Sequence, residues 1–385
     1  MQQRTIAYSA AALLAFAFCY GANLYFSLNG NVNDPIVSPW VPLTKDVLLI
    51  VAAAAAVFVS RADIPGALRS PSLWGLGAFA ALSSIVAAAS MGFNLEIASL
   101  SKNLVLYLFG GFAVASLISG QIGLTCCVRV VLVALAVSFV VSLLLLLHPV
   151  QSYDGRLYGT YGNPTSLGFA AVVAAGLLLW TGREWFVVVG AAIAAVFSSM
   201  TGSASVMLAA LVLFAGFGLL EAMSKRSLRA AALGVGAYLA VFVLFGLVSG
   251  WLGIPAFGFE RMMQFLGAPG DILASDSISI RAQDFAHGRA TASTYHRYDS
   301  FLLSVWRNLG LIPLLAYGAF VVVILLGYAM SVRSPKDNSF AVLFLALFVL
   351  NPLLQHQLEI FPTNLLFGAV AALTMVQFTG RQQAA

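Results

Sequence analysis

The stretch RVVLVALAVSFVVSLLLLLH, residues 129–148, decides the class of this protein because its apolar run is almost unbroken. A bilayer core about 30 Å thick needs roughly 20 helical residues, and lipid offers no water to the backbone. The run therefore predicts a helix that crosses a membrane. The whole chain has the same character: 61% of its residues are hydrophobic and 9% are charged, whereas soluble domains carry about 25% charged residues. We expect an all-α integral membrane protein.

Apolar runs bounded by polar or turn-forming residues predict about twelve transmembrane helices. The expected spans are 5–26, 42–59, 73–90, 99–119, 129–148, 165–181, 185–200, 204–222, 231–250, 300–331, 338–352 and 359–378. The first run is too long and too weakly flanked for a cleaved signal peptide, so we expect it to be retained. The first part of the tenth span, 300–308, can form a separate interfacial helix before Gly310.

The expected organisation has three parts. Residues 1–249 carry spans one to nine, residues 250–299 form a large external loop with short helices, and residues 300–385 carry spans ten to twelve. Lys and Arg near span ends tend to stay cytoplasmic. With the N-terminus inside, eleven of the nineteen cations fall at the inner face, and both termini are cytoplasmic.

The other eight cations fall at or near the outer face, where the topology does not require them. They are Lys45, Lys102, Arg156, Arg261, Arg281, Arg289, Arg297 and Arg307. The four histidines join them: His148, His287, His296 and His356. Cations near spans oppose insertion, which favours a functional reason for them. The alternative is that the two lysines snorkel to the head groups and the arginines are solvated.

Cysteines and carboxylates give no sign of a metal centre. The cysteines are Cys19, Cys126 and Cys127, all in or beside spans, so neither a disulfide framework nor a metal-ligand spacing is implied. The external acids Asp271, Asp276 and Asp284 are irregularly spaced among apolar and small residues. We therefore expect no metal. We also expect no cofactor and no nucleic-acid partner.

Residues 148–168 form a shaped external loop with glycines at 155, 159 and 162 and a helix-start signal at Asn163-Pro164. Arg156 can grip a phosphate oxygen through a bidentate fork. Tyr158 and Tyr161 can stack on a sugar ring, or they can belong to an interfacial aromatic belt.

Two shorter connections are also predicted to be external. Residues 198–205 are small and rich in hydroxyl groups, which suits either a polar site or a close approach of two helices. His356 and Glu359 lie between the last two spans. We expect them to be turn residues exposed to water, with the alternative that they reach the same external site.

The order of these motifs resembles the O-antigen ligase and O-antigen polymerase superfamily. The resemblance covers about residues 150–375 and runs from Arg156-Leu-Tyr-Gly-Thr-Tyr-Gly-Asn-Pro, through a Thr-Gly-Ser turn and the large loop, to Asp299-Ser-Phe-Leu-Leu-Ser-Val-Trp-Arg-Asn-Leu-Gly310. It implies a multi-pass glycosyltransferase of the bacterial inner membrane, active at the periplasmic face in surface polysaccharide biosynthesis. The donor would be a glycan on undecaprenyl diphosphate.

The resemblance leaves two acceptors open. A polymerase moves the glycan onto another lipid-linked repeat, and a ligase moves it to the lipid A-core of lipopolysaccharide. In ligases, the resemblance implies loop arginines that hold the diphosphate and a loop histidine. The matching arginines of this chain are Arg281, Arg289 and Arg297, and the matching histidine is His296. The ligase pattern places Asn, Ser or Gln after that histidine, whereas Arg297 follows it here. The run that begins at Asp299 looks more like the polymerase version, so polymerase leads.

The chemistry of a glycosyl diphosphate assigns roles to these residues. The leaving diphosphate is neutralised by fixed cations rather than by a metal, and we expect Arg156, Arg281, Arg289, Arg297, Lys45 and Lys102 to bind it. His296 is the expected general base, with Asp299 and Asp284 as rivals. The alternative is that His296 is a structural histidine that bridges loop backbone groups. His287 joins Tyr158 and Tyr161 as a substrate contact.

Two other classes remain open. A transporter of an anionic lipid or solute predicts charges near the membrane midplane and an internal repeat. A structural membrane protein makes the order of the motifs a coincidence.

Overall fold

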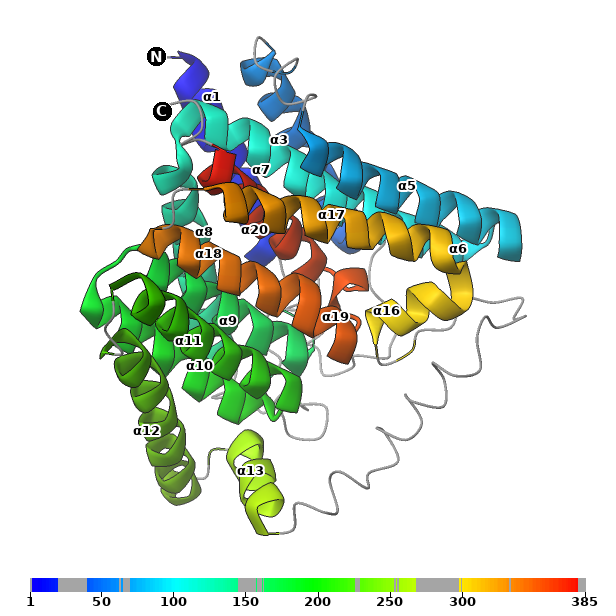
Figure 1. The fold of residues 1–385 in the computed structure, drawn as a ribbon. Coiled ribbons are helices and arrows are strands. Elements are labelled where there is room, and N and C mark those ends of the chain that lie inside the picture. The colour runs from blue at the N-terminus through cyan, green and yellow to red at the C-terminus, as the bar shows by residue number, and fades with distance from the viewer. Residues whose placement is uncertain are drawn as a thin grey trace.

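The computed structural model describes residues 2–19, 40–61, 64, 70–144, 157, 161, 163–225, 229–252, 254, 256–267, 298, 300–331 and 334–379. Within these ranges every regular element is a helix (Figure 1). The elements of the first half are α1 (Gln2–Cys19), α3 (Trp40–Ser60), α5 (Pro71–Met91), α6 (Leu95–Ser101), η1 (Lys102–Phe109), α7 (Gly110–Ile122), α8 (Leu124–Leu144), α9 (Pro164–Trp180) and α10 (Glu184–Thr201). Those of the second half are α11 (Ala204–Lys225), α12 (Arg229–Leu252), α13 (Phe257–Gly267), α16 (Phe301–Ser304), η5 (Val305–Leu309), α17 (Leu311–Met330), α18 (Pro335–Leu345), η6 (Ala346–Leu350), α19 (Asn351–Leu354), η7 (Gln357–Glu359) and α20 (Thr363–Thr379).

Eight helical segments in the described part of the chain are long and apolar enough to cross a membrane. They are Pro71–Met91, Leu95–Ile122, Leu124–Leu144, Glu184–Thr201, Ala204–Met223, Ala232–Leu252, Leu311–Met330 and Pro335–Leu354. Two further apolar helices, α9 and α20, are shorter. The expectation of an all-helical, membrane-embedded protein is confirmed at this level, and the total of twelve spans stays a prediction.

The predicted tenth span is divided where the sequence indicated. The Ser300 side chain accepts a hydrogen bond from the Leu303 backbone N–H and so caps α16. Gly310 ends η5 with a φ of 81°, a backbone conformation that residues with a Cβ rarely adopt. Helix α17 begins at the next residue. The separate helix expected before Gly310 is therefore confirmed.

Helices α9 and α20 form the centre of the bundle. Every residue of α9 from Ser166 to Trp180 is buried, and a helix that is apolar all round must be surrounded by other elements. Helix α20 packs on η1 and α7 at backbone distance. A Cβ added at Gly368 would lie 2.2 Å from the Leu108 carbonyl oxygen, and one at Gly111 would lie 2.8 Å from the Leu365 carbonyl oxygen. Two glycines therefore set the separation of these helices.

Polar contacts sort the connections into two ends of the bundle, which we name the Lys102 end and the Glu221 end. The pairs at the Glu221 end are Tyr8–Cys126, Arg229–Glu184, Asn338–Glu221 and Trp180–Gln377. The pairs at the Lys102 end are Lys102–Asp46, Leu157–Met200, Thr165–Ser203, Arg261–Gly202, Ser166–Gln357 and Phe301–Gln355. Each pair joins segments that the sequence placed on the same side of the membrane. The orientation of the two ends stays a prediction.

Gly368→Ala should destabilise the bundle. The added methyl group overlaps the Leu108 carbonyl, and overpacking costs about 1–3 kcal/mol, whereas replacing a helical glycine by alanine gains about 1 kcal/mol at best. The midpoint of thermal unfolding in detergent should fall. Gly236→Ala in α12, where a Cβ meets nothing within 4 Å, should leave the midpoint unchanged or raise it. Equal midpoints for the two variants would contradict the close contact.

Candidate functional site

Most of the predicted site residues lie outside the described residues. These are the expected catalytic residues and most of the expected diphosphate and substrate contacts: His296, Asp299, Arg156, Arg281, Arg289, Arg297, Tyr158 and His287. The rival base Asp284 lies outside as well. Lys45, Lys102 and Tyr161 are described, and all three lie in segments of the Lys102 end.

Lys102 forms an ion pair with an acid that the sequence reading missed. Its Nζ lies 3.4 Å from the Asp46 Oδ2, and the two side chains are 41% and 14% exposed. The Tyr107 hydroxyl donates a hydrogen bond to the other carboxylate oxygen of Asp46. The Asp46 carboxylate is thus held between an ammonium group and a phenol, and it offsets the charge of Lys102.

Lys45 lies against the aromatic rings of the same group. Its Nζ is 4.0 Å from the centre of the Phe361 ring and 5.2 Å from the centre of the Tyr107 ring. The two rings are in contact, with centroids 4.7 Å apart. A cation over a ring face is attracted to it by about 0.5–2 kcal/mol. Lys45, Asp46, Lys102, Tyr107 and Phe361 are referred to below as the lysine cluster.

The local geometry of η1 brings Lys102 and Tyr107 to the same partner. η1 is π-helical, with bonds between residues five apart, and Lys102 and Tyr107 are separated by five positions. The Asn364 side chain also donates a hydrogen bond of 3.1 Å to the Asn103 carbonyl, which ties the start of α20 to η1. Phe361, three positions before Asn364, is thereby held beside Tyr107. Two lysines and one acid leave the lysine cluster with one excess positive charge.

The motif loop and the hydroxyl-rich turn meet beside the start of α9. Asn163 caps this helix by accepting bonds from the Thr165 and Ser166 backbone N–H groups at 2.8 and 3.3 Å. The Thr165 hydroxyl donates to the Ser203 hydroxyl at 3.3 Å. Tyr161 is only 1% exposed, so its ring is enclosed by protein and presents no face to solvent in this structure.

Helix α13, the first part of the predicted large loop, docks on the same turn. The Arg261 guanidinium Nη1 donates to the Gly202 carbonyl at 2.8 Å. A Cβ at Gly258 would lie 2.5 Å from the Ser198 carbonyl oxygen, so the backbones of α13 and α10 are in contact. Figure 1 shows α13 beside the ends of α10 and α12. The small residues at 198–205 thus permit a close helix approach, which was one of the two readings.

The last connection is more deeply packed than expected. Glu359 is 1% exposed and buried, so the expectation of a water-exposed turn residue is wrong for it. Gln357 beside it is also 1% exposed, and its Oε1 accepts a 2.5 Å hydrogen bond from the Ser166 hydroxyl. Burying a carboxylate is costly without partners. The burial of Glu359 could not be predicted from this short polar stretch of sequence. It is caused by α9 and the other helices that pack around the connection.

Several buried polar side chains at this end make no hydrogen bond with the residues that the structure describes. They include the Asn351 amide, whose Nδ2 and Oδ1 both lack a partner, and the hydroxyls of Thr363 and Ser199. An unpaired buried polar group costs about 1–3 kcal/mol. Such groups in a native protein call for an explanation, of which a bound molecule or water is one.

A search among family models, curated proteins and solved structures gives no significant match to the chain. A fixed excess of positive charge beside aromatic faces suits an anionic group attached to an apolar or sugar moiety.

Arg261→Ala should loosen α13 from the bundle, because it removes the hydrogen bond to the Gly202 carbonyl. Amide hydrogen exchange in Phe257–Gly267 should become about 10- to 100-fold faster, since one charge-assisted bond is worth about 1.5–3 kcal/mol. Glu260→Ala on the same helix is the matched control, because Glu260 is exposed. Unchanged exchange in Arg261→Ala would show that the backbone contact at Gly258 holds the helix alone.

Proposed function

We propose that this chain is a membrane glycosyltransferase of the O-antigen ligase and polymerase superfamily. It transfers a glycan from undecaprenyl diphosphate and polymerises O-antigen or a related surface polysaccharide. One observation carries the proposal. The described parts of the sequence motifs, which lie between Leu157 and Gln357, are joined by hydrogen bonds at one end of the bundle. The lysine cluster lies at the same end.

The proposed reaction has one bond-forming and one bond-breaking event. An acceptor hydroxyl oxygen attacks the anomeric carbon of the donor sugar, and the bond from that carbon to the diphosphate oxygen breaks. The diphosphate leaves with the bonding electrons, so negative charge grows on it during the reaction. Preorganised cations aimed at that charge lower the barrier, with no need for a metal.

The described cations of the proposed site divide this task unequally. Lys102 is already paired with Asp46, whereas Lys45 contacts ring faces and forms no ion pair with any residue that the structure describes. Lys45 is therefore the better-placed ammonium for a diphosphate oxygen, and Asp46 and Tyr107 position Lys102. Arg156, Arg281, Arg289 and Arg297 complete the proposed grip. His296 takes the acceptor proton, with Asp299 as the rival base, and His287 and Tyr158 contact the glycan.

The proposed setting is the bacterial inner membrane. The chain crosses it twelve times with both termini in the cytoplasm, and the 250–299 loop and the Lys102 end face the periplasm. The excess of cations at the Glu221 end in the sequence supports this orientation, because Lys and Arg in short loops tend to stay cytoplasmic.

Purified protein incubated with lipid-linked repeats tests the activity directly. Reactions with and without a lipid A-core acceptor should be resolved by mass. We expect a ladder of lengthened glycans on the carrier lipid, which identifies a polymerase. Glycan on lipid A-core would instead identify the ligase alternative. Absence of transfer with both acceptors, in protein that remains folded and monodisperse, would refute the proposed function.

The lysine cluster gives a graded prediction within this assay. Lys45→Met keeps the apolar contact with Phe361 but removes the charge, and should lower kcat/KM by about 10- to 100-fold, the worth of a charge-assisted contact of about 1.5–3 kcal/mol. Lys102→Met should have a smaller effect, since Asp46 already offsets that charge. Arg183→Met, at an exposed position near Glu184 and the opposite end, is the control. Equal activity of Lys45→Met and Arg183→Met would remove Lys45 from the site.

A further inference from the structure

An apolar groove runs along the outward side of the seam between α1 and α8. Its volume is about 570 Å³. Its lining residues come from these two helices: Ala12, Ala15, Phe16, Arg129, Val130, Val133, Ala134, Val137, Ser138 and Val141. Val133 and Val137 are more than half exposed. Phe16 from α1 is also more than half exposed, so a long apolar molecule can enter the groove from the side.

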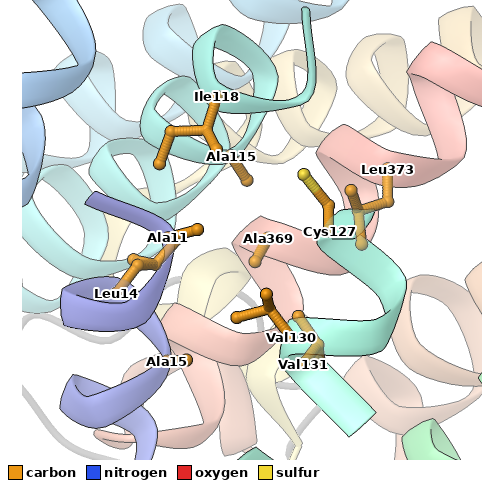
Figure 2. A pocket seen from close by; sticks show the side chains of 10 residues that line it. All are labelled: Ala11, Leu14, Ala15, Ala115, Ile118, Cys127, Val130, Val131, Ala369 and Leu373. Atoms are coloured by element: carbon orange, nitrogen blue, oxygen red, sulfur yellow. The ribbon is translucent and has the colours of Figure 1, made fainter. Parts of the chain in front are cut away.

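The inward side of the same seam does not offer a comparable space. Figure 2 shows apolar side chains from α1, α7, α8 and α20 around a cavity of about 20 Å³. That volume is about the space of a single water molecule, and its lining is apolar. Ala15 and Val130 line both the cavity and the groove. The groove is therefore the side of the seam that can hold a ligand.

One end of the groove carries a positive charge. Arg129 lines the groove, is exposed, and forms no hydrogen bond or ion pair with any residue that the structure describes. Arg4 lies at the same end, because it is one turn before Tyr8, and the Tyr8 hydroxyl is 3.6 Å from Cys126 Sγ. The chemistry at this end suits a phosphate.

The length of the groove matches that of a lipid acyl chain. Arg129 and Val141 are twelve positions apart on α8, which corresponds to about 18 Å at 1.5 Å per residue. Half of a bilayer core of about 30 Å is about 15 Å. A molecule with its anionic group at Arg129 therefore has room in the groove for a chain that crosses one leaflet.

We propose that the groove between α1 and α8 binds one anionic phospholipid, with its phosphate at Arg129 and one acyl chain along α8. The head group lies at the Glu221 end, opposite the lysine cluster, so this lipid is not the proposed glycan donor. A zwitterionic phospholipid offers the same chain but no net charge to Arg129, whose guanidinium has no partner among the described residues. The preference for an anionic lipid therefore depends on Arg129. The binding of either lipid depends on the shape of the groove.

Native mass spectrometry of the full chain in detergent, titrated with phosphatidylglycerol or phosphatidylcholine, tests this site. The first phosphatidylglycerol should bind at least about fivefold more tightly than the first phosphatidylcholine, a difference of about 1 kcal/mol. Arg129→Gln should bring the two lipids to equal affinity. Arg183→Gln removes another exposed arginine near the same end and should keep the preference.

A variant that fills the groove distinguishes lipid binding in the groove from binding by surface charge alone. Val137→Trp places a large ring in the groove at an exposed position, so the fold tolerates it, and it should weaken the binding of both lipids. The proposal is overturned if the protein shows no preference for phosphatidylglycerol, if Arg129→Gln keeps that preference, or if Arg183→Gln loses it equally. It is also overturned if Val137→Trp leaves lipid binding intact but converts a dimer into a monomer, since a second copy would then occupy the groove.

Discussion

The structure depends on one constraint, which is that backbone and side-chain polar groups inside a bilayer must find their partners within the protein. The helices satisfy the backbone, and the side chains follow the same rule at the Glu221 end. The Asn338 amide donates to the Glu221 carboxylate at 2.9 Å, and the Gln377 amide donates to the Asp337 carboxylate at 2.6 Å. Asp337 also accepts bonds from the Ser334 backbone and hydroxyl. These two buried acids are thus held by neutral donors.

The Lys102 end follows the rule less completely. The buried side chains of Asn351 and Thr363 make no hydrogen bonds within the described residues, and the lysine cluster keeps an excess positive charge. π-helical segments also lie at this end, in η1 and in η6 just before Asn351, and such segments occur often at functional sites. Buried polar side chains without partners and π-helical backbone thus occur together at the end where we propose the site. Their coincidence supports the proposed site independently of any sequence motif.

Much of the fold was predictable because apolar periodicity reports directly on membrane helices. The run at 73–90 corresponds to α5 (Pro71–Met91), and Gly310 divides the tenth predicted span as its position in the sequence indicated. The sorting of connections into two ends also followed from the order of spans. The site was less predictable. Lys45 and Lys102 were singled out by their position near span ends, but Asp46 was missed because it lies 56 positions before Lys102 in another helix.

The sequence by itself determined that the chain is helical, that it belongs in a membrane, and which residues are candidates for chemistry, because these properties depend on local composition and spacing. The tertiary structure alone decided which candidates meet. It paired Lys102 with Asp46, placed Phe361 against Lys45, docked α13 on the turn at Gly202, and buried Glu359. Each of these contacts joins segments far apart in the chain, or depends on a neighbouring helix that local sequence does not specify. They are caused by the packing of the helices, which sets the distances between residues of different helices. The periodicity of the sequence does not specify these distances.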